Sequence, residues 1–226
     1  MSSKQKKQSL IATLLIILLI LIDQIIKVVV KLNMNLGDSI HIFDWFQIQF
    51  IENNGMAWGM ELGSKLFLSV FRIVAIGFLI WYISNCIKRG ARMGYIIVLS
   101  MITAGAAGNI FDSLFYGQIF TASTPYYVEG ATPATLVSWG QGYAPVLMGK
   151  VVDMFYFPLF HGTFPDWFPV WGGESFTFFS PIFNFADSCI SVGVFIIILA
   201  FRKDFNGWVP ATEKKVSDKE NIADNQ

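Results

Sequence analysis

The stretch LIATLLIILLILIDQIIKVVV, residues 10–30, decides the fold class. A helix that crosses the hydrocarbon core of a bilayer needs about 20 predominantly apolar residues, and this run supplies them with Asp23 and Lys27 as its only charges. A signal peptide would be followed by a cleavage site of small residues, and none follows here. We therefore predict a retained first transmembrane helix.

Three further apolar runs predict three more spans, near residues 66–83, 94–111 and 182–201. The chain is 54% apolar and 14% charged, whereas a soluble domain carries about 25% charged residues. The sequence thus predicts an all-α membrane protein with one four-helix domain over residues 1–210. The polar residues 211–226 predict a disordered cytoplasmic tail.

Lysine and arginine fix the expected orientation, because cytoplasmic flanks of membrane spans collect these residues. With the N-terminus inside, only Lys31, Lys65 and Lys150 fall outside. We therefore expect both termini in the cytoplasm. The cations expected there are Lys4, Lys6, Lys7, Lys88, Arg89, Arg92, Arg202, Lys203, Lys214, Lys215 and Lys219.

With this orientation, two segments are expected on the extracytoplasmic side of the membrane. Residues 46–50 alternate apolar and polar side chains as a half-buried strand does, and turn residues bracket them, which predicts a small β element against the outer membrane face. Residues 112–181 are rich in aromatic side chains, which settle at headgroup depth. This long segment is either a lid over a site or a skirt at the interface, and its aromatic content favours the membrane.

Charges inside the spans are costly, at roughly 2.5–3.5 kcal/mol each on insertion scales. Asp23 and Lys27 lie four residues apart on one helix face, which predicts a structural ion pair. Arg72 lies near the outer end of the second span. It either supplies positive charge to a site or extends its side chain to the headgroups.

Amides and carboxylates recur at the outer ends of the last two spans. Asn109 and Asp112 are one helical turn apart, as are Asn184 and Asp187, and Asp153 lies in the apolar stretch VVDMFYF, residues 151–157. Carboxylates in one low-dielectric zone raise one another's pKa, and two that meet share a proton. One can then activate water while the other protonates a peptide carbonyl. Spacing nominates Asp112 for this chemistry alongside Asp153 and Asp187.

Other reaction types are poorly supported. The histidines, His41 and His161, accompany no serine or cysteine motif, and no His-Glu-x-x-His occurs, so we expect no metal and no cofactor. A net charge of +0 argues against a nucleic-acid partner. The rival hypothesis is a small four-span transporter or channel, which would also carry charges within its spans. Its acids should be distributed through the membrane, whereas the inner halves of these spans carry none.

Five blocks in order also give the chain a resemblance to a known family, the bacterial lipoprotein signal peptidases, or signal peptidase II. The resemblance covers the four spans and the first outer segment, but leaves out most of residues 117–149, parts of 158–180 and the tail. The blocks are Asp23-Gln24-Ile25-Ile26-Lys27, Asn53-Asn54-Gly55-Met56-Ala57-Trp58, Gly105-Ala106-Ala107-Gly108-Asn109-Ile110-Phe111-Asp112, Val151-Val152-Asp153 and Phe183-Asn184-Phe185-Ala186-Asp187-Ser188-Cys189-Ile190.

The resemblance implies an aspartyl endopeptidase of the bacterial inner membrane that removes signal peptides from prolipoproteins, cutting just before a diacylglyceryl-modified cysteine. Its partners would be that lipid-modified substrate and membrane phospholipid, and we expect a monomer with its active site at the outer face. By motif position Asp153 and Asp187 would form the catalytic dyad and Asn184 would orient it. The same positions imply that Asn53, Gly55 and Asn109 hold the substrate main chain, and that Asp23, Lys27 and Asp112 support the site.

One position departs from the family pattern. Ser113 stands where the family usually has arginine after the aspartate of the third block. Arg72 is the candidate to supply the missing positive charge.

Overall fold

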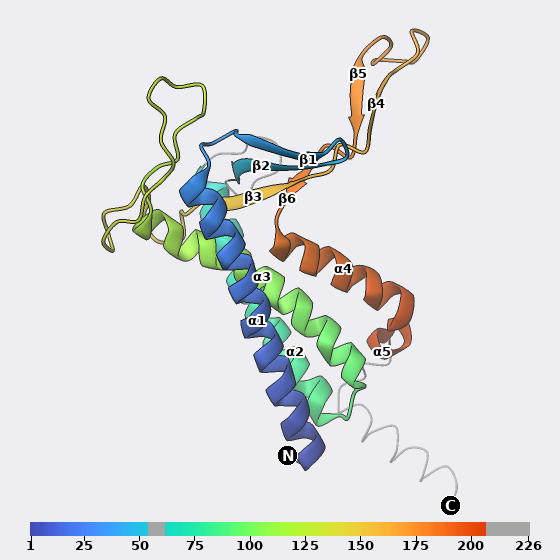
Figure 1. The fold of residues 1–226 in the computed structure, drawn as a ribbon. Helices are drawn as coiled ribbons and strands as arrows, with labels where there is room; N and C mark the ends of the chain where they lie inside the picture. The colour runs from blue at the N-terminus through green and yellow to red at the C-terminus, as the bar shows by residue number, and fades with distance from the viewer. Residues whose placement is uncertain (54–61, 207–226) are drawn as a thin grey trace, which may run out of the picture.

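Helices dominate the structure, a computed structural model that describes residues 1–53 and 62–206 (Figure 1). Among the described residues, three helices are long and apolar enough to cross a membrane: α1 (Ser3–Asn33), α2 (Leu62–Lys88) and α3 (Met93–Ile119). A shorter apolar helix, α4 (Phe185–Ala200), follows near the end of the chain, and α5 (Arg202–Asn206) comes directly after it. The chain is therefore a multi-pass membrane protein.

The predicted fourth span differs most from its expected form. Residues 182–183 form a strand, and α4 has 16 residues, fewer than the roughly 20 that cross a bilayer unaided. The count of four spans stays a prediction. The predicted tail, residues 211–226, lies outside the described residues.

Helix α3 lies at the centre of the helical part, where it packs against α1, α2 and α4 (Figure 1). Two glycines permit its closest approaches. A Cβ atom on Gly105 would lie 2.3 Å from the carbonyl oxygen of Ala186 on α4, and one on Gly108 would lie 2.6 Å from Oδ2 of Asp23 on α1. The small residues of this helix thus let its neighbours approach closely.

Four antiparallel strands form a sheet over the ends of the helices, in the order β1-β2-β3-β6 (Figure 1). The strands are β1 (Ser39–Phe43), β2 (Phe46–Asn53), β3 (Val151–Tyr156) and β6 (Ile182–Phe183). A separate hairpin, β4 (Phe160–Thr163) with β5 (Ser175–Phe178), projects away from the helices.

The β element predicted from residues 46–50 is present, but its extension by the later strands was not predicted, so the class all-α is too narrow. Strand β3 is buried from Val151 to Met154, so its sequence is a short apolar run without the alternation that marks a half-buried strand. The register matters for function. Asp153 lies opposite Ile51 of β2, and Phe155 lies opposite Phe183 of β6, one residue before Asn184.

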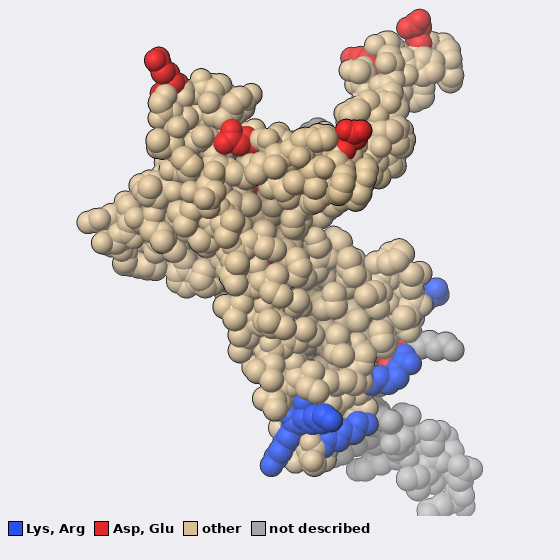
Figure 2. Space-filling view, in the orientation of Figure 1, with Lys and Arg blue, Asp and Glu red and all other residues tan. Residues whose placement is uncertain are grey.

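Charged side chains on the surface divide between the two ends of the molecule. In Figure 2, lysine and arginine gather at the end that holds the N-terminus, whereas the visible acids of the sheet, the hairpin and the loops lie at the opposite end. This separation agrees with the expected orientation, in which the end with the cations faces the cytoplasm.

Candidate active site

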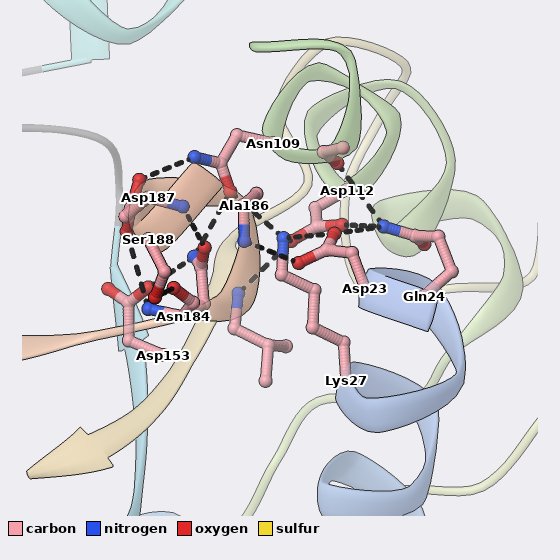
Figure 3. Close-up of polar contacts among 12 residues, drawn as sticks. Asp23, Gln24, Lys27, Asn109, Asp112, Asp153, Asn184, Ala186, Asp187 and Ser188 are labelled. Atoms are coloured by element: carbon pink, nitrogen blue, oxygen red, sulfur yellow. Dashed lines mark hydrogen bonds and ion pairs between the residues drawn. The ribbon is translucent and has the colours of Figure 1, made fainter. Parts of the chain in front are cut away.

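Polar side chains from three elements meet beneath the sheet, at its junction with the helices (Figure 3). Asp153 comes from β3, Asn109 from α3, and Asn184 with Asp187 from the start of α4. Asn109, Asn184 and Asp187 were predicted at the outer ends of the spans, and Asp153 in the outer segment between them.

The start of α4 fixes two of these side chains by its own hydrogen bonds. Asn184 is the N-cap, and its Oδ1 accepts from the backbone N–H of Asp187 at 2.9 Å. In return, Oδ2 of Asp187 accepts from the backbone N–H of Asn184 at 3.4 Å. This is a capping box, which satisfies backbone donors that the first turn of a helix leaves free. Asp187 is therefore held at the helix N-terminus, where a carboxylate is favourable.

Two amides connect the two carboxylates. Nδ2 of Asn184 donates to Oδ1 of Asp153 at 2.6 Å and to Oδ1 of Asn109 at 3.0 Å. Nδ2 of Asn109 then donates to Oδ1 of Asp187 at 2.7 Å. Asp153 and both amides are buried, whereas Asp187 is half-buried, so the connected group opens to its surroundings on the Asp187 side.

Asp153 has an unusual proton affinity. Burial and, after it, the charge of Asp187 raise the pKa of this carboxyl to about 7, against the opposing effect of the hydrogen bonds from Asn184 and Asn53. Near neutral pH, the protonated and ionised forms of Asp153 are thus both present. A pair of acids that holds one proton can donate it and accept another in one reaction.

A second cluster, around the fully buried Lys27, lies beside the first. Lys27 Nζ is 2.9 Å from Oδ2 of Asp23, 2.9 Å from Oδ2 of Asp112 and 2.9 Å from Oδ1 of Asn109. The predicted pair of Asp23 and Lys27 is present, and Asp112 joins it. Asn109 belongs to both clusters, so the lysine fixes an amide that also contacts Asp187.

The same acids hold the strand and the helix that carry the candidate dyad. Asp112 accepts from the backbone N–H of Val152, the residue before Asp153, at 3.3 Å. Asp23 accepts from the backbone N–H of Ala186, the residue before Asp187, at 3.0 Å. Asp112 has no exposed surface, and Lys27 and Gln24 also contact it, so its geometry suits positioning rather than proton transfer.

The remaining predicted site residues that the structure describes differ in how they relate to these two clusters. Arg72, half-buried on α2, interacts electrostatically with Asp187, Asp112 and Asp153. Ser113 is buried and its Oγ donates to the carbonyl oxygen of Asn109 at 3.3 Å, along its own helix. Gly55 lies outside the described residues. Asn53 ends β2, and its side chain bonds to Asp153.

Sequence reasoning missed two parts of this region. Nε2 of Gln24 donates to Asp112 at 2.8 Å and to Asp23 at 3.0 Å. Lys31, predicted among the outer cations, has no exposed surface and pairs with Glu52 at 2.5 Å. Lys31 follows Lys27 by one helical turn, a spacing that places both side chains on one face and was the available signal.

The carboxylate of Glu52, near the dyad, contacts several polar side chains. Its Oε1 also accepts from Ser123 at 2.7 Å, and its Oε2 lies 3.1 Å from Lys150 Nζ. Burial opposes the charge of Glu52, but Lys31, Ser123 and Lys150 together outweigh it and hold the pKa of Glu52 below its usual range. This network therefore joins α1 to β2 at the residue before Asn53.

Comparisons with known proteins agree on one family. A family model described as signal peptidase (SPase) II matches residues 15–203. The chain is 51% identical over 197 residues to a lipoprotein signal peptidase of Porphyromonas gingivalis, covering 87% of this chain and 84% of that one. It is 37% identical over 193 residues to one of Amoebophilus asiaticus, covering 82% and 75%.

A solved structure supports the fold. It is a bacterial membrane enzyme determined at 1.9 Å resolution, with a TM-score of 0.56 and 24% identity. The similarity covers 85% of this chain and 93% of that one.

Proposed function

Because the chain belongs to the signal peptidase II family, a family of lipoprotein signal peptidases, we propose that it cuts its substrate as an aspartic endopeptidase with Asp153 and Asp187 as the dyad. The substrate in this proposal is a diacylglyceryl-modified prolipoprotein, cut just before the lipidated cysteine. The observation that carries the proposal is the hydrogen-bonded connection from Asp153 through Asn184 and Asn109 to Asp187.

The proposed reaction needs only water and the two carboxyl groups. The ionised carboxylate removes a proton from water as the water oxygen attacks the scissile carbonyl, and the protonated carboxyl donates its proton to the carbonyl oxygen. The resulting tetrahedral intermediate is not attached to the protein. On its collapse the C–N bond breaks, the leaving amine takes the proton that came from water, and a hydroxyl of the intermediate returns its proton to the second carboxylate, which restores the starting pair. The raised pKa of Asp153 suits it to be the proton donor at the start.

The surrounding residues would keep this pair in position. Asn184 and Asn109 hold the two carboxyl groups, and we assign Asn53 and Gly55 to the substrate main chain. Asp112 and Asp23 hold the backbone at the residue before each dyad member, and Lys27 pairs with both of these acids. Arg72 supplies positive charge where the family pattern has the arginine that Ser113 replaces.

The location of the site fits an exported substrate. The dyad lies at the sheet end of the helices, opposite the end with the lysines and arginines (Figures 1 and 2). With that basic end in the cytoplasm, both termini are cytoplasmic and the dyad lies at the outer face of the inner membrane. A prolipoprotein anchored by its signal peptide would present its cleavage site at this level.

The rival reading, a transporter or channel, receives no support. Within the described helices α1 to α4, the acids Asp23, Asp112 and Asp187 all belong to the two adjoining clusters near the sheet. Charges aligned through the depth of the membrane would be expected of a path for ions.

The test is cleavage of a purified prolipoprotein, with and without its diacylglyceryl group, by the wild type and by Asp153→Asn and Asp187→Asn. Both variants should lose cleavage while remaining folded in detergent. Asp44→Asn is the control, because Asp44 is a fully exposed acid that contacts His41 on the β1–β2 hairpin. Turnover at the wild-type rate by either dyad variant refutes the assignment, and equal cleavage of the unmodified substrate refutes the proposed specificity.

A further inference from the structure

The segment between α3 and β3 has an uncharged part with large exposed side chains. Residues 130–149 contain no Asp, Glu, Lys, Arg or His. Within them, Leu136 is 60% exposed, Trp139 is 60% exposed and Val146 is 45% exposed. Grouped apolar side chains on a surface mark a site of contact with a protein or a membrane.

This segment is fixed to the last turns of α3. Five of its backbone N–H groups donate to carbonyl oxygens of that helix or its C-cap, at 2.9–3.2 Å: Val137 to Ile119, Gly140 to Gln118, Tyr143 to Phe120, Ala144 to Gly117 and Gly149 to Ser113. The packing is close, since a Cβ atom on Gly117 would lie 2.5 Å from the carbonyl oxygen of Ala144. Its depth in the membrane is therefore set by α3.

The position of α3 places the segment near the membrane boundary. The ring of Trp139 lies 6.1 Å from that of Phe115, which in turn lies 4.6 Å from that of Phe111, an exposed residue of α3. Phe115 is about 33 Å along the helix from Met93, at about 1.5 Å per residue. The hydrocarbon core is about 30 Å thick, so Trp139 lies close to its outer boundary.

We infer that residues 136–146 rest in the headgroup region of the outer leaflet, with Trp139 as the anchor and the lipid bilayer as the partner. Trp139 of this segment packs through Phe115 beside the exposed apolar side chain of Phe111 on α3, and the segment's lack of charge suits an interface. Tryptophan is enriched at this depth because its ring is apolar and its N–H is polar. In Figure 2 the visible surface around the C-terminal end of α3 shows neither the blue of Lys and Arg nor the red of Asp and Glu.

The β4–β5 hairpin provides the contrast. Its loop is also aromatic, and Trp167 is 78% exposed. However, the hairpin projects away from the helices and carries Asp166 and Glu174 (Figures 1 and 2). We expect this hairpin in water, so the aromatic residues of the two parts have different surroundings.

Site-directed spin labelling of the full chain in phospholipid vesicles tests this placement. The two free cysteines, Cys86 and Cys189, are buried and are first replaced by alanine. A nitroxide is then attached in Trp139→Cys, in Leu136→Cys and, as the matched comparison, in Trp167→Cys. Collision of each label is measured with oxygen, which concentrates in lipid, and with a water-soluble nickel chelate.

The labels at 136 and 139 should favour oxygen over the nickel chelate several-fold more than the label at 167 does. Equal access of the nickel chelate to all three positions would place the segment in water and overturn the inference. Protection of 136 and 139 from both reagents would also overturn it, because a protein partner or a second copy would then cover the segment. Two labelled positions keep the test decisive if one variant does not fold.

Discussion

The carboxylate of Asp23 accepts a hydrogen bond at 3.0 Å from the backbone N–H of Ala186, so the first transmembrane helix holds the first turn of α4. Asp187 is the next residue. Asp23, which is not part of the dyad, thus helps to determine where Asp187 lies. The same acid contacts Lys27, so positioning and charge balance depend on one side chain.

Asp23→Ala should lower prolipoprotein cleavage by about 10²-fold, since a displacement of about 1 Å at a reacting group costs that much. It should also lower stability, because breaking a buried ion pair costs about 3–5 kcal/mol. Asp23→Asn keeps an acceptor for the Ala186 N–H and should retain more activity. Initial cleavage rates and thermal melting in the same detergent measure both effects. Equal activity of Asp23→Ala and the wild type would contradict this role.

Glycine should be required where α3 meets α4. In Gly105→Ala, the new methyl group would overlap the carbonyl oxygen of Ala186, and overpacking costs about 1–3 kcal/mol. Gly77→Ala is the matched control, because a Cβ atom there meets nothing within 4 Å among the described residues. It should be neutral or stabilising by about 0.5–1 kcal/mol, the usual cost of glycine within a helix. Similar melting temperatures for the two variants would show that this contact is not tight.

The pKa of Asp153 predicts a stability change that depends on pH. Its folded-state value, about 7, lies above the unfolded value of about 3.9, so the contribution of this group to stability is complete below pH 4 and is lost as pH rises through 7. Asp153→Asn cannot ionise. It should therefore melt at a higher temperature than the wild type at pH 8, with the difference shrinking toward pH 4. A difference that is constant from pH 4 to pH 8 would argue against the raised pKa.

Glu52 should matter for stability although it lies outside the dyad. Glu52→Gln leaves Lys31 buried without its carboxylate, a loss of about 3–5 kcal/mol. The double variant Glu52→Gln with Lys31→Met removes the buried cation as well and should recover much of that loss. Chemical or thermal unfolding in detergent compares the three proteins. No recovery in the double variant would mean that the charge pair is not the cause.

Arg72→Gln should lower cleavage about tenfold or more, which corresponds to about 1.4 kcal/mol in the barrier. The reason is the loss of a positive charge that interacts with Asp187 and Asp153. Arg72→Lys keeps the charge and should be less affected. Arg202→Gln, an exposed arginine at the basic end, is the control and should cleave normally. Unchanged turnover by folded Arg72→Gln would exclude this contribution.

Residue spacing along the chain predicted many of the local contacts, because the side chains that meet on one helix are set by their spacing alone. Asp23 and Lys27 form their ion pair because four residues make about one helical turn, and the capping box of Asn184 and Asp187 uses three. Hydropathy likewise indicated the apolar helices. It could not show that the last of them, α4, would be as short as 16 residues, because its first expected residues form a strand instead.

By itself, then, the sequence determined the membrane class and the family resemblance, and motif position nominated Asp153 and Asp187 as the candidate dyad. It left Asp112 open, since its spacing from Asn109 suits either role. Only the tertiary structure decided that Asp112 contacts Lys27 and Val152, that β3 brings Asp153 to Asn184, and that Lys31 reaches Glu52. The physical reason is that these contacts join segments far apart in the chain. Their partners are set by how helices and strands pack, which no local spacing encodes.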